Sequence, residues 1–579
     1  MTVEAVDVTC QGPRSVCITS AKSPCLSCAV IAHSVEDPFY YLHNFRQVLD
    51  WVELRYTDLL DPEEHAFIRV FSDLPGAAQA LLVRMVMRKG ELFRTDKLDY
   101  AEIGCPHAAL QPLLERGWVD DKVELELEQL FNLLRKEELV RCFAAQLSRP
   151  KAAKSDLLAQ LQPLQLLARP LGQWYPDFPE RIVFWRLQPL CDRLRLLFFG
   201  NLYQDWSEFV LADIGLLRYE QVAFSADSRA LRSREDVDLA MALHQCAERL
   251  EQGESPLQLL LTLDGLHSDN PWLGRRRARL LFSLGQQCER LGEWDQALAV
   301  YGSCKHPQAR IRQVRVYERS ERWQQAHTLA TLMSESPMND LEVQALGRML
   351  PRLARKLGGA PQARKRAPAI TLLELELPIE HAVFGVEEAV RRYFAESGGQ
   401  VHYLENALFN SLFGLLCWEA IFAPVPGAFF HPFQSAPQDL HEADFQQRRG
   451  DLFQACLAQL DDGRYLQAIR DCYLIKRGLQ SPFVHWSALT DEVLEQALAC
   501  LPPAHLKASF VRLLQDIRNN RTGMPDLIQF WPEQGAYRMV EVKGPGDRLQ
   551  DNQLRWLDFC REHGLPVAVC HVRWRSEAA

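Results

Sequence analysis

No uninterrupted apolar run in this 579-residue chain reaches the roughly 18 residues that a membrane-spanning helix needs. The chain also lacks a basic opening followed by an apolar stretch, which a secretory signal would show. Both absences predict a soluble, intracellular protein without a membrane partner. The 16 cysteines follow no disulfide framework, and several, such as Cys142, Cys417 and Cys472, lie in apolar helical stretches. Reduced, partly buried thiols are therefore expected.

A surplus of positive charge is also missing, because 65 Lys and Arg face 75 Asp and Glu, for a net charge of −10. This excludes a surface that coats nucleic acid indiscriminately, although binding depends on local charge. The charge is uneven. Residues 351–370 hold six bases and no acid, and residues 501–579 carry eleven Lys and Arg against nine Asp and Glu. Basic stripes on an acidic body fit a selective, channelled substrate.

The densest group of chemistry-bearing residues follows position 518. Met524-Pro525-Asp526 opens an apolar run, a turn with proline and glycine follows, and a second apolar run ends in Glu541-Val542-Lys543. This pattern predicts a β-hairpin. Side chains two apart on a strand share a face, so Glu541 and Lys543 point the same way while Val542 turns into the core. Asp526, at the head of the partner strand, can then meet them.

Two carboxylates that converge on one spot repel each other, and in a phosphodiesterase one or two divalent cations with oxygen ligands relieve the repulsion. A lysine two residues after a ligand can orient or deprotonate the attacking water, or neutralise charge on the scissile phosphate. The hairpin therefore predicts a nuclease centre. Asp followed at a distance by Glu-x-Lys is a weak signal alone, because many surface hairpins carry such residues in contact with solvent.

The flanking sequence extends the hairpin to a small α/β core. Asp547 is the expected N-cap of a helix that reaches about Glu562, and a further strand follows it. Upstream, residues 370–377 predict a strand and residues 385–397 a helix. Residues 402–422 predict an apolar helix with Glu405 in its first turn, where the helix dipole favours a carboxylate.

Three motifs carry a family resemblance: GlyMetProAspLeu (523–527), GluValLysGlyProGlyAspArgLeu (541–549) and GlnLeuArgTrpLeu (553–557). In this order and spacing they resemble the VRR-NUC domain of the PD-(D/E)xK nuclease superfamily and, more narrowly, the Fanconi-associated nuclease family. SerLeuPheGlyLeuLeuCysTrp (411–418) is similar to the same family. The chain lacks the ubiquitin-binding zinc finger of eukaryotic members, which suggests a bacterial member.

The resemblance implies both the site and its metal. It places Glu405, Asp526, Glu541 and the backbone carbonyl of Val542 around one or two Mg²⁺ or Mn²⁺ ions. Lys543 would align the attacking water, and Gln434 aligns with a glutamine that lines the site.

The fold class is multidomain and mainly α. Its repeats rest on ArgLeuGlyGluTrpAspGlnAlaLeu (290–298), which aligns with ArgSerGluArgTrpGlnGlnAlaHis (319–327) at a period of 29. The expected division is a disordered extension at 1–38, a winged-helix-like helical domain at 39–122, a SAP-like DNA-binding module at 123–168, TPR-like helical repeats at 169–357, a basic linker at 358–369, and a VRR-NUC nuclease domain with the α/β restriction-endonuclease-like (PD-(D/E)xK) fold at 370–579. The extension contains one C-x2-C pair, Cys25 and Cys28, and a zinc site there is the less favoured alternative.

Basic residues outside the core are the expected DNA contacts. Arg149, Lys151 and Lys154 of the SAP-like module would meet the phosphate backbone. The resemblance implies a pocket for a 5′-phosphate between the repeats and the segment before Asp526, with Arg518 and Arg521 on one side and Arg310, Arg315 and Lys365 on the other. Two basic clusters in the repeats, at 275–279 and 310–315, would present a face of the repeats to DNA. For each cluster an ordinary solvated helix face is the alternative.

The sequence therefore predicts a structure-selective, metal-dependent DNA phosphodiesterase that acts on branched or 5′-flap DNA. The resemblance implies 5′-flap endonuclease and 5′-to-3′ exonuclease activity in interstrand-crosslink repair. The alternatives are a non-catalytic DNA-binding scaffold with an inactive nuclease fold, and a restriction-type endonuclease. No protein partner or oligomeric state is indicated. The expected location is the cytoplasm, at the nucleoid, for a bacterial protein and the nucleus for a eukaryotic one.

Overall fold

The computed structural model describes residues 37–204, 206, 217–359 and 370–575. The expected extension at 1–38 lies almost wholly outside these residues, together with Cys25 and Cys28. Most of the basic linker, including Lys365, also lies outside them. Within the described ranges, no helix is both long and apolar enough to cross a membrane.

The N-terminal domain is a group of helices closed by a small sheet, as expected for a winged-helix-like unit. Asp61 caps α2 by accepting a hydrogen bond from the N–H of Glu64 (2.8 Å), and the Glu64 carboxylate accepts one from the N–H of Asp61 (2.9 Å). The sheet has the order β1-β5-β2 with antiparallel pairing. The elements are α1 (Tyr40–Tyr56), α2 (Pro62–Asp73), α3 (Gly76–Val86), β1 (Leu92–Arg94), α4 (Pro106–Glu115), β2 (Val119–Asp120), β5 (Ile182–Trp185) and α9 (Gln188–Phe199).

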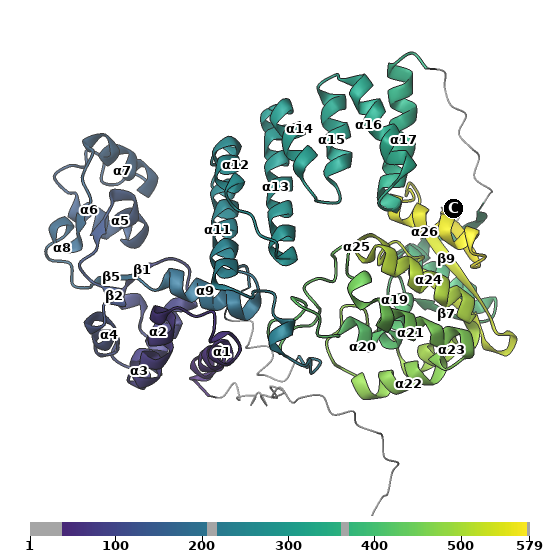
Figure 1. The fold of residues 1–579 in the computed structure, drawn as a ribbon, viewed down its shortest axis with the longest axis horizontal. Coiled ribbons are helices and arrows are strands. Elements are labelled where there is room, and N and C mark those ends of the chain that lie inside the picture. Colours follow the sequence, from purple (N-terminus) through teal and green to yellow (C-terminus); the bar gives the residue numbers. More distant parts are fainter. Residues whose placement is uncertain (1–36, 205, 207–216, 360–369, 576–579) are drawn as a thin grey trace, which may run out of the picture.

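The SAP-like module is inserted between β2 and β5, so the middle strand of the first sheet comes from residues that the sequence places among the repeats. The module has a separate core that includes Leu130, Leu139 and Leu157, and it stands at the far left of Figure 1. Its elements are β3 (Glu124–Leu125), α5 (Leu127–Leu133), α6 (Lys136–Cys142), α7 (Lys154–Leu161), β4 (Arg169–Pro170) and α8 (Leu171–Trp174).

The repeats are antiparallel helical hairpins, and the two tryptophans of the 29-residue period hold equivalent places. Trp294 begins α14 and Trp323 begins α16, each the second helix of a hairpin. The first hairpin turns at Gly292, whose φ of 78° is costly for other residues. The helices are α11 (Arg234–Glu251), α12 (Pro256–Asp264), α13 (Pro271–Leu291), α14 (Trp294–Ser303), α15 (Ala309–Arg319), α16 (Trp323–Glu335) and α17 (Asp340–Lys356).

The C-terminal domain is built on a five-stranded mixed sheet of order β6-β10-β9-β8-β7. β10 runs parallel to β6 and β9, whereas β8 is antiparallel to β9 and β7. The strands are β6 (Thr371–Pro378), β7 (Gln400–Tyr403), β8 (Leu527–Trp531), β9 (Ala536–Lys543) and β10 (Val567–Arg575). Val540 and Val542 pack with Val390 of α18 (Val386–Glu396), while Ile528 and Met539 join the large core on the other face.

Helices surround this sheet and form the rest of the domain. They are α18 (Val386–Glu396), α19 (Leu408–Leu416), α20 (Trp418–Ile421), α21 (Gly450–Asp462), α22 (Tyr465–Lys476), α23 (Asp491–Cys500), α24 (Pro503–Gln515), α25 (Ile517–Asn520) and α26 (Asp551–Glu562).

Two local predictions in this domain are wrong. The expected helix at 402–422 starts instead as strand β7 and becomes helical only at Leu408, because Asn406 has a left-handed φ of 54° that interrupts the helix. Asp547 does not cap the last long helix. Its Oδ2 accepts a hydrogen bond from the N–H of Gly544 (3.0 Å) in a turn, and α26 begins four residues later behind Gln550.

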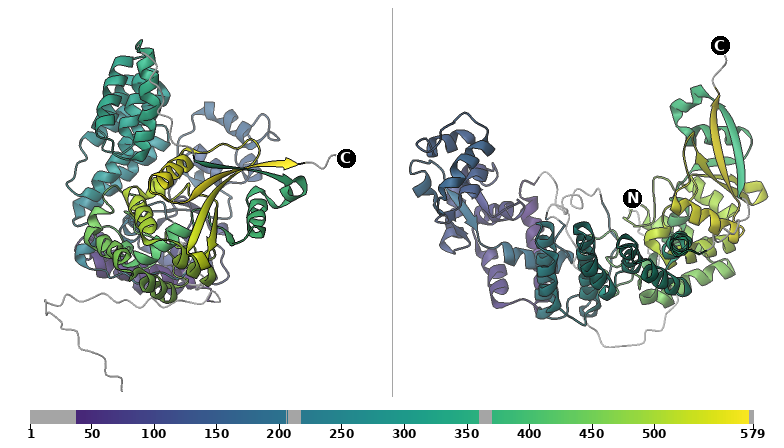
Figure 2. Two further views of the ribbon diagram at one scale, coloured as in Figure 1. Left: turned by 90° about the vertical axis from the view of Figure 1, so that its right-hand side faces the viewer. Right: turned by 90° about the horizontal axis from the view of Figure 1, so that it is seen from above.

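The domains form an arch, with the SAP-like module at one end, the C-terminal domain at the other and the repeats between them (Figure 2, right). The last repeat helix docks on the core. Arg348 of α17 pairs with Asp551 of α26 (2.6 Å), and Arg512 of α24 pairs with Asp340 (2.9 Å).

Candidate active site

The β8–β9 hairpin brings three of the predicted residues together. Leu527 lies opposite Val540 and Ile528 opposite Met539, so the same register places Asp526 opposite Glu541. Lys543 follows two residues later on the same face, and Val542 packs into the core as predicted. The strand pairing thus places two carboxylates and an ammonium group together at the end of the sheet where β9 finishes and β8 starts.

Glu541 is the buried centre of this group, with none of its surface exposed. Its Oε1 accepts a hydrogen bond from Lys543 Nζ at 2.5 Å, but its Oε2 has no hydrogen-bond partner among the described residues. Asp526 accepts a hydrogen bond from the N–H of Val542 at 2.8 Å. A buried oxygen without a partner is costly, so the free Oε2 marks a place for a further positive group.

Glu405 reaches this end of the sheet from the residues that follow the neighbouring strand, β7. The N–H of Leu404 donates to the carbonyl of Asp526 (3.1 Å), which joins the end of β7 to the start of β8. The Glu405 carboxylate accepts hydrogen bonds from Tyr403 Oη and from Asn406 Nδ2, both at 2.8 Å. Sequence patterns did not single out Tyr403 or Asn406, although both are immediate neighbours of a predicted ligand.

The electrostatics of the group match its burial. Burial raises the pKa of Asp526 to about 6 and that of Glu541 to about 7. The negative charge of Glu405 is a smaller contribution to both raised pKa values, and Lys543 opposes the rise. These carboxylates therefore interact as one cluster, although Glu405 lies more than a hundred residues before the others in the sequence.

The donor set fits a hard divalent cation, since carboxylate oxygens are the ligands such ions prefer. Among the described residues, no three acidic, histidine or cysteine side chains are already gathered at metal-binding spacing. The contacts explain this spacing: Glu405 turns to Tyr403 and Asn406, and Glu541 turns to Lys543. The partnerless Oε2 of Glu541 and the mutual repulsion of the carboxylates both favour a cation at this place.

A pH dependence of stability follows for the metal-free protein. The folded-state pKa values of Asp526 and Glu541 lie above their ordinary values of 3.8 and 4.5, so the folded state retains protons that the unfolded state has lost. The burial penalty is absent below about pH 4 and complete above about pH 7. In EDTA, the melting temperature of Glu541→Gln should therefore rise relative to that of wild type as the pH increases from about 4 to about 7. A temperature difference that does not change with pH would contradict this linkage.

Gln434, the predicted site-lining glutamine, makes its hydrogen bonds within its own loop. It is buried, and its Oε1 accepts hydrogen bonds from the N–H groups of Phe430 (2.5 Å) and His431 (3.2 Å). Its Nε2 donates to the carbonyls of Ala428 and Ala436. Because every polar atom of its amide serves the backbone of its own loop, Gln434 stabilises that loop.

The predicted phosphate-binding residues divide into paired and free groups. Arg521 donates to the carbonyl of Pro482 (2.7 Å), and Arg310 lies 3.7 Å from the buried carboxylate of Glu342. Arg518 is exposed. Burial first, and then the charge of Arg518, lowers the pKa values of His306 in the repeats and His441 in the C-terminal domain.

Arg315 occupies a different place from Arg518. It lines a cavity of about 830 Å³ between the last repeats and α26, together with Arg348, Arg352 and Arg555. Arg352 is paired there with Glu318 (2.7 Å) and Arg348 with Asp551 (2.6 Å). The cavity wall therefore includes arginines that are already neutralised.

In the SAP-like module, Arg149 and Lys151 are exposed, whereas Lys154 donates to the carbonyl of Leu134 (2.8 Å). Only the first two side chains keep their charge wholly toward solvent.

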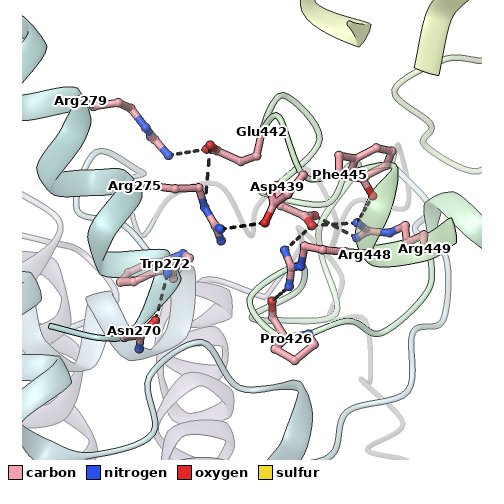
Figure 3. Close-up of polar contacts among 11 residues, drawn as sticks. Asn270, Trp272, Arg275, Arg279, Pro426, Asp439, Glu442, Phe445, Arg448 and Arg449 are labelled. Atoms are coloured by element: carbon pink, nitrogen blue, oxygen red, sulfur yellow. Dashed lines mark hydrogen bonds and ion pairs between the residues drawn. The ribbon is translucent and has the colours of Figure 1, made fainter. Parts of the chain in front are cut away.

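The basic cluster at 275–279 does not form a free DNA face. Arg279 of α13 pairs with Glu442 at 2.7 Å (Figure 3). Arg275 pairs with Asp444 at 3.3 Å. Arg276 stacks on Trp272 and donates to the carbonyl of Gly200. Arg275 and Arg279 hold the repeats against the loop that precedes α21, because Asp444 and Glu442 of that loop neutralise them.

Three family models match the chain. The model described as FAN1, HTH domain matches residues 39–120, the Fanconi anemia-associated nuclease SAP domain matches residues 124–174, and the VRR-NUC domain matches residues 460–574. The last match includes Asp526, Glu541 and Lys543.

Whole-chain comparisons agree with these models. The Fanconi-associated nuclease 1 homolog of Pseudomonas aeruginosa is 59% identical over 544 residues, which cover 94% of this chain and 97% of that protein. The homolog of Arabidopsis thaliana is 26% identical, over 94% of this chain and 68% of that protein. The crystal structure of paFAN1 bound to 2-nucleotide 5′-flap DNA with a gap has a TM-score of 0.86 and 58% identity, and covers 94% of this chain and 100% of that one. The chain therefore belongs to the Fanconi-associated nuclease family of DNA-cleaving hydrolases.

Proposed function

We propose that this nuclease cuts branched DNA near 5′ flaps and trims DNA from 5′ ends, with Mg²⁺ or Mn²⁺, during interstrand-crosslink repair. The observation that carries the proposal is the buried Glu541, which has Asp526 opposite it, Lys543 beside it and one oxygen without a partner. The similar paFAN1 protein, solved with 5′-flap DNA, supports the choice of substrate. By analogy with the bacterial relative, we place its action at the nucleoid in the cytoplasm.

The roles of the side chains follow from their positions. The carboxylates of Glu405, Asp526 and Glu541, with the carbonyl of Val542, would hold one or two cations. A bound divalent cation lowers the pKa of a water ligand and stabilises charge on the phosphate. The Lys543 ammonium, 2.5 Å from Glu541, is placed to orient the attacking water and to offset negative charge on the scissile phosphate. Burial of Glu541 and Asp526 excludes bulk water and strengthens these interactions.

The direct test is cleavage of labelled 5′-flap, 3′-flap, splayed-arm and blunt duplex DNA by the purified protein, with Mn²⁺, Mg²⁺ or EDTA. We expect cleavage of the 5′-flap substrate with either metal and none in EDTA. Equal cleavage of all four substrates would contradict flap selectivity, and cleavage in EDTA would contradict the metal mechanism.

A prediction for the SAP-like module concerns salt. Log affinity falls linearly with log salt concentration, with a slope of ~0.9 per phosphate contact. If Arg149 and Lys151 contact phosphates, replacing both by glutamine should make this slope less steep by about two units. Adding Lys154→Gln should change the slope little, because Lys154 already donates to Leu134. Fluorescence anisotropy in EDTA at several salt concentrations measures the slope.

A matched control removes the same number of positive charges from surface residues that are already paired with acids. Arg464 and Lys507 are paired with Asp462 and Asp461 at 2.8 and 2.7 Å. The double substitution of these two residues by glutamine should leave the slope unchanged. If the Arg149 and Lys151 variant matches this control, the module does not touch DNA.

A further prediction concerns the 5′ end of the flap. A terminal phosphate carries close to two negative charges near pH 7 and is best held by arginine. Arg518 is exposed and its positive charge acts on both His306 and His441, so Arg518→Gln should weaken cleavage of 5′-phosphorylated flaps about 10-fold more than that of 5′-hydroxyl flaps. The ratio of kcat/KM for the two substrates measures this preference.

Arg477→Gln, which removes an exposed arginine paired with Asp491, is the control and should keep the wild-type ratio. An equal loss on both flaps for Arg518→Gln would assign that arginine to the scissile phosphate or to the fold.

A further inference from the structure

Asn406 connects the two segments that carry the acidic ligands. Its Nδ2 donates to Glu405 Oε1 at 2.8 Å, and its Oδ1 accepts a hydrogen bond from the N–H of Met524 at 3.1 Å. Met524 lies two residues before Asp526. A single side-chain amide therefore binds one predicted ligand and the backbone beside another, although the two ligands are far apart in the sequence.

A second asparagine, one helical turn later, supports this connection. Asn410 is almost wholly buried, and its Nδ2 donates to the carbonyls of Asn406 (2.5 Å) and Arg521 (2.8 Å). The start of α19 is thereby joined to the 521–524 segment at two points. The position of Glu405 relative to Asp526 then depends on side-chain amides as well as on the pairing of β7 with β8.

The backbone at Asn406 is suited to this task and to few residue types. Its φ is 54°, in the left-handed region that asparagine and glycine enter most readily. This turn ends the strand-like course of the chain and directs the amide of Asn406 back toward Met524. Most other residue types with a β-carbon would incur a backbone cost at this φ and would lose the two hydrogen bonds.

We propose that Asn406 is the positioning residue of the metal centre, which fixes the Glu405 carboxylate against the Met524–Asp526 segment so that the ligands from both segments can share one cation. This inference rests on the proposed divalent-metal function. Groups that orient metal ligands typically change metal affinity by about 10- to 100-fold when they are removed. Asn406 does not touch the reacting atoms, so its effect passes through Glu405.

The test uses Asn406→Gly, because glycine accepts the left-handed backbone and removes only the amide. We expect the Kd for Mn²⁺, measured on DNA-free protein by electron paramagnetic resonance of the free ion, to rise about 10- to 100-fold. The Mn²⁺ concentration for half-maximal cleavage should rise in parallel. The KM for DNA and the rate at saturating Mn²⁺ should remain close to wild type. Thermal unfolding in EDTA checks that the variant is folded.

Two further variants separate positioning from other effects. Gln165 also has a positive φ, of 44°, in the distant SAP-like module, so Gln165→Gly makes the same backbone change away from the site and should bind Mn²⁺ as wild type does. Tyr403→Phe removes the other donor to Glu405 but keeps the link to Met524, and its loss of affinity should be smaller than that of Asn406→Gly.

The outcomes are distinct. If wild type binds Mn²⁺ and folded Asn406→Gly binds it equally well, the inference is overturned. Equal losses in Asn406→Gly and Tyr403→Phe would also overturn it, because the link to Met524 would then contribute nothing. If the wild-type protein itself binds no Mn²⁺, the proposed function fails instead.

Discussion

Replacing Glu541 by glutamine is expected to reduce cleavage of 5′-flap DNA by about 10³-fold or more, which corresponds to ~4 kcal/mol of transition-state stabilisation. Glu541 is wholly buried between Asp526 and Lys543, and its Oε2 has no other partner. The amide keeps the shape of the side chain but loses the charge that a cation needs. Single-turnover cleavage with saturating Mn²⁺ measures the loss, and Mn²⁺ affinity should fall with it.

Binding of DNA in EDTA should change little in this variant, because Glu541 lies inside the site and contributes no positive charge. The control is Glu374→Gln on β6 of the same sheet, an exposed carboxylate that lies 3.5 Å from Arg573. This variant should cleave DNA as wild type does. Near-normal turnover by Glu541→Gln would contradict the assignment of the active site.

Replacing Lys543 by methionine should lower the rate of the chemical step by about 10²- to 10⁴-fold, the range typical of a positioned proton-transfer group. Unlike Glu541→Gln, this variant should retain Mn²⁺ binding, since Lys543 is no ligand and its ammonium competes with a cation for Glu541. The expected pattern is a large loss in kcat with little change in the KM for DNA. Comparing Mn²⁺ affinity with single-turnover rate separates the two variants.

The control for charge is Lys507→Met, which removes a partly exposed lysine paired with Asp461. It should cleave at the wild-type rate. Loss of Mn²⁺ binding in Lys543→Met would show that the lysine maintains the site's structure, and that outcome would contradict a role restricted to the water and the phosphate.

Short patterns in the sequence determined much of the fold and the centre of the site. The β8–β9 hairpin, the shared face of Glu541 and Lys543, and the two tryptophan-led hairpins of the repeats were all predicted, and the structure confirms them. Each depends on the fixed geometry of neighbouring residues, namely a period of two along a strand or a helical hairpin repeated along the chain. Such features can be predicted without knowing which residues pack against them.

Tertiary structure decided the features that join distant segments. The middle strand of the first sheet comes from beyond an inserted module, and Arg275 and Arg279 are neutralised by a loop more than 160 residues away. Gln434 is committed to its own loop, which its sequence position does not reveal. In each case the role of a side chain depends on which partner reaches it.

The link between Glu405 and the β8–β9 hairpin shows most clearly which features the sequence determines and which depend on the tertiary structure. The motif around Glu405 predicts a ligand at this position, but the carboxylate is held by Asn406, whose amide also accepts a hydrogen bond from the N–H of Met524 across the fold. The sequence determines which residue types are available at the site. Only the folded chain decides which of them meet, because hydrogen bonding and burial depend on partners that chain closure brings together from afar.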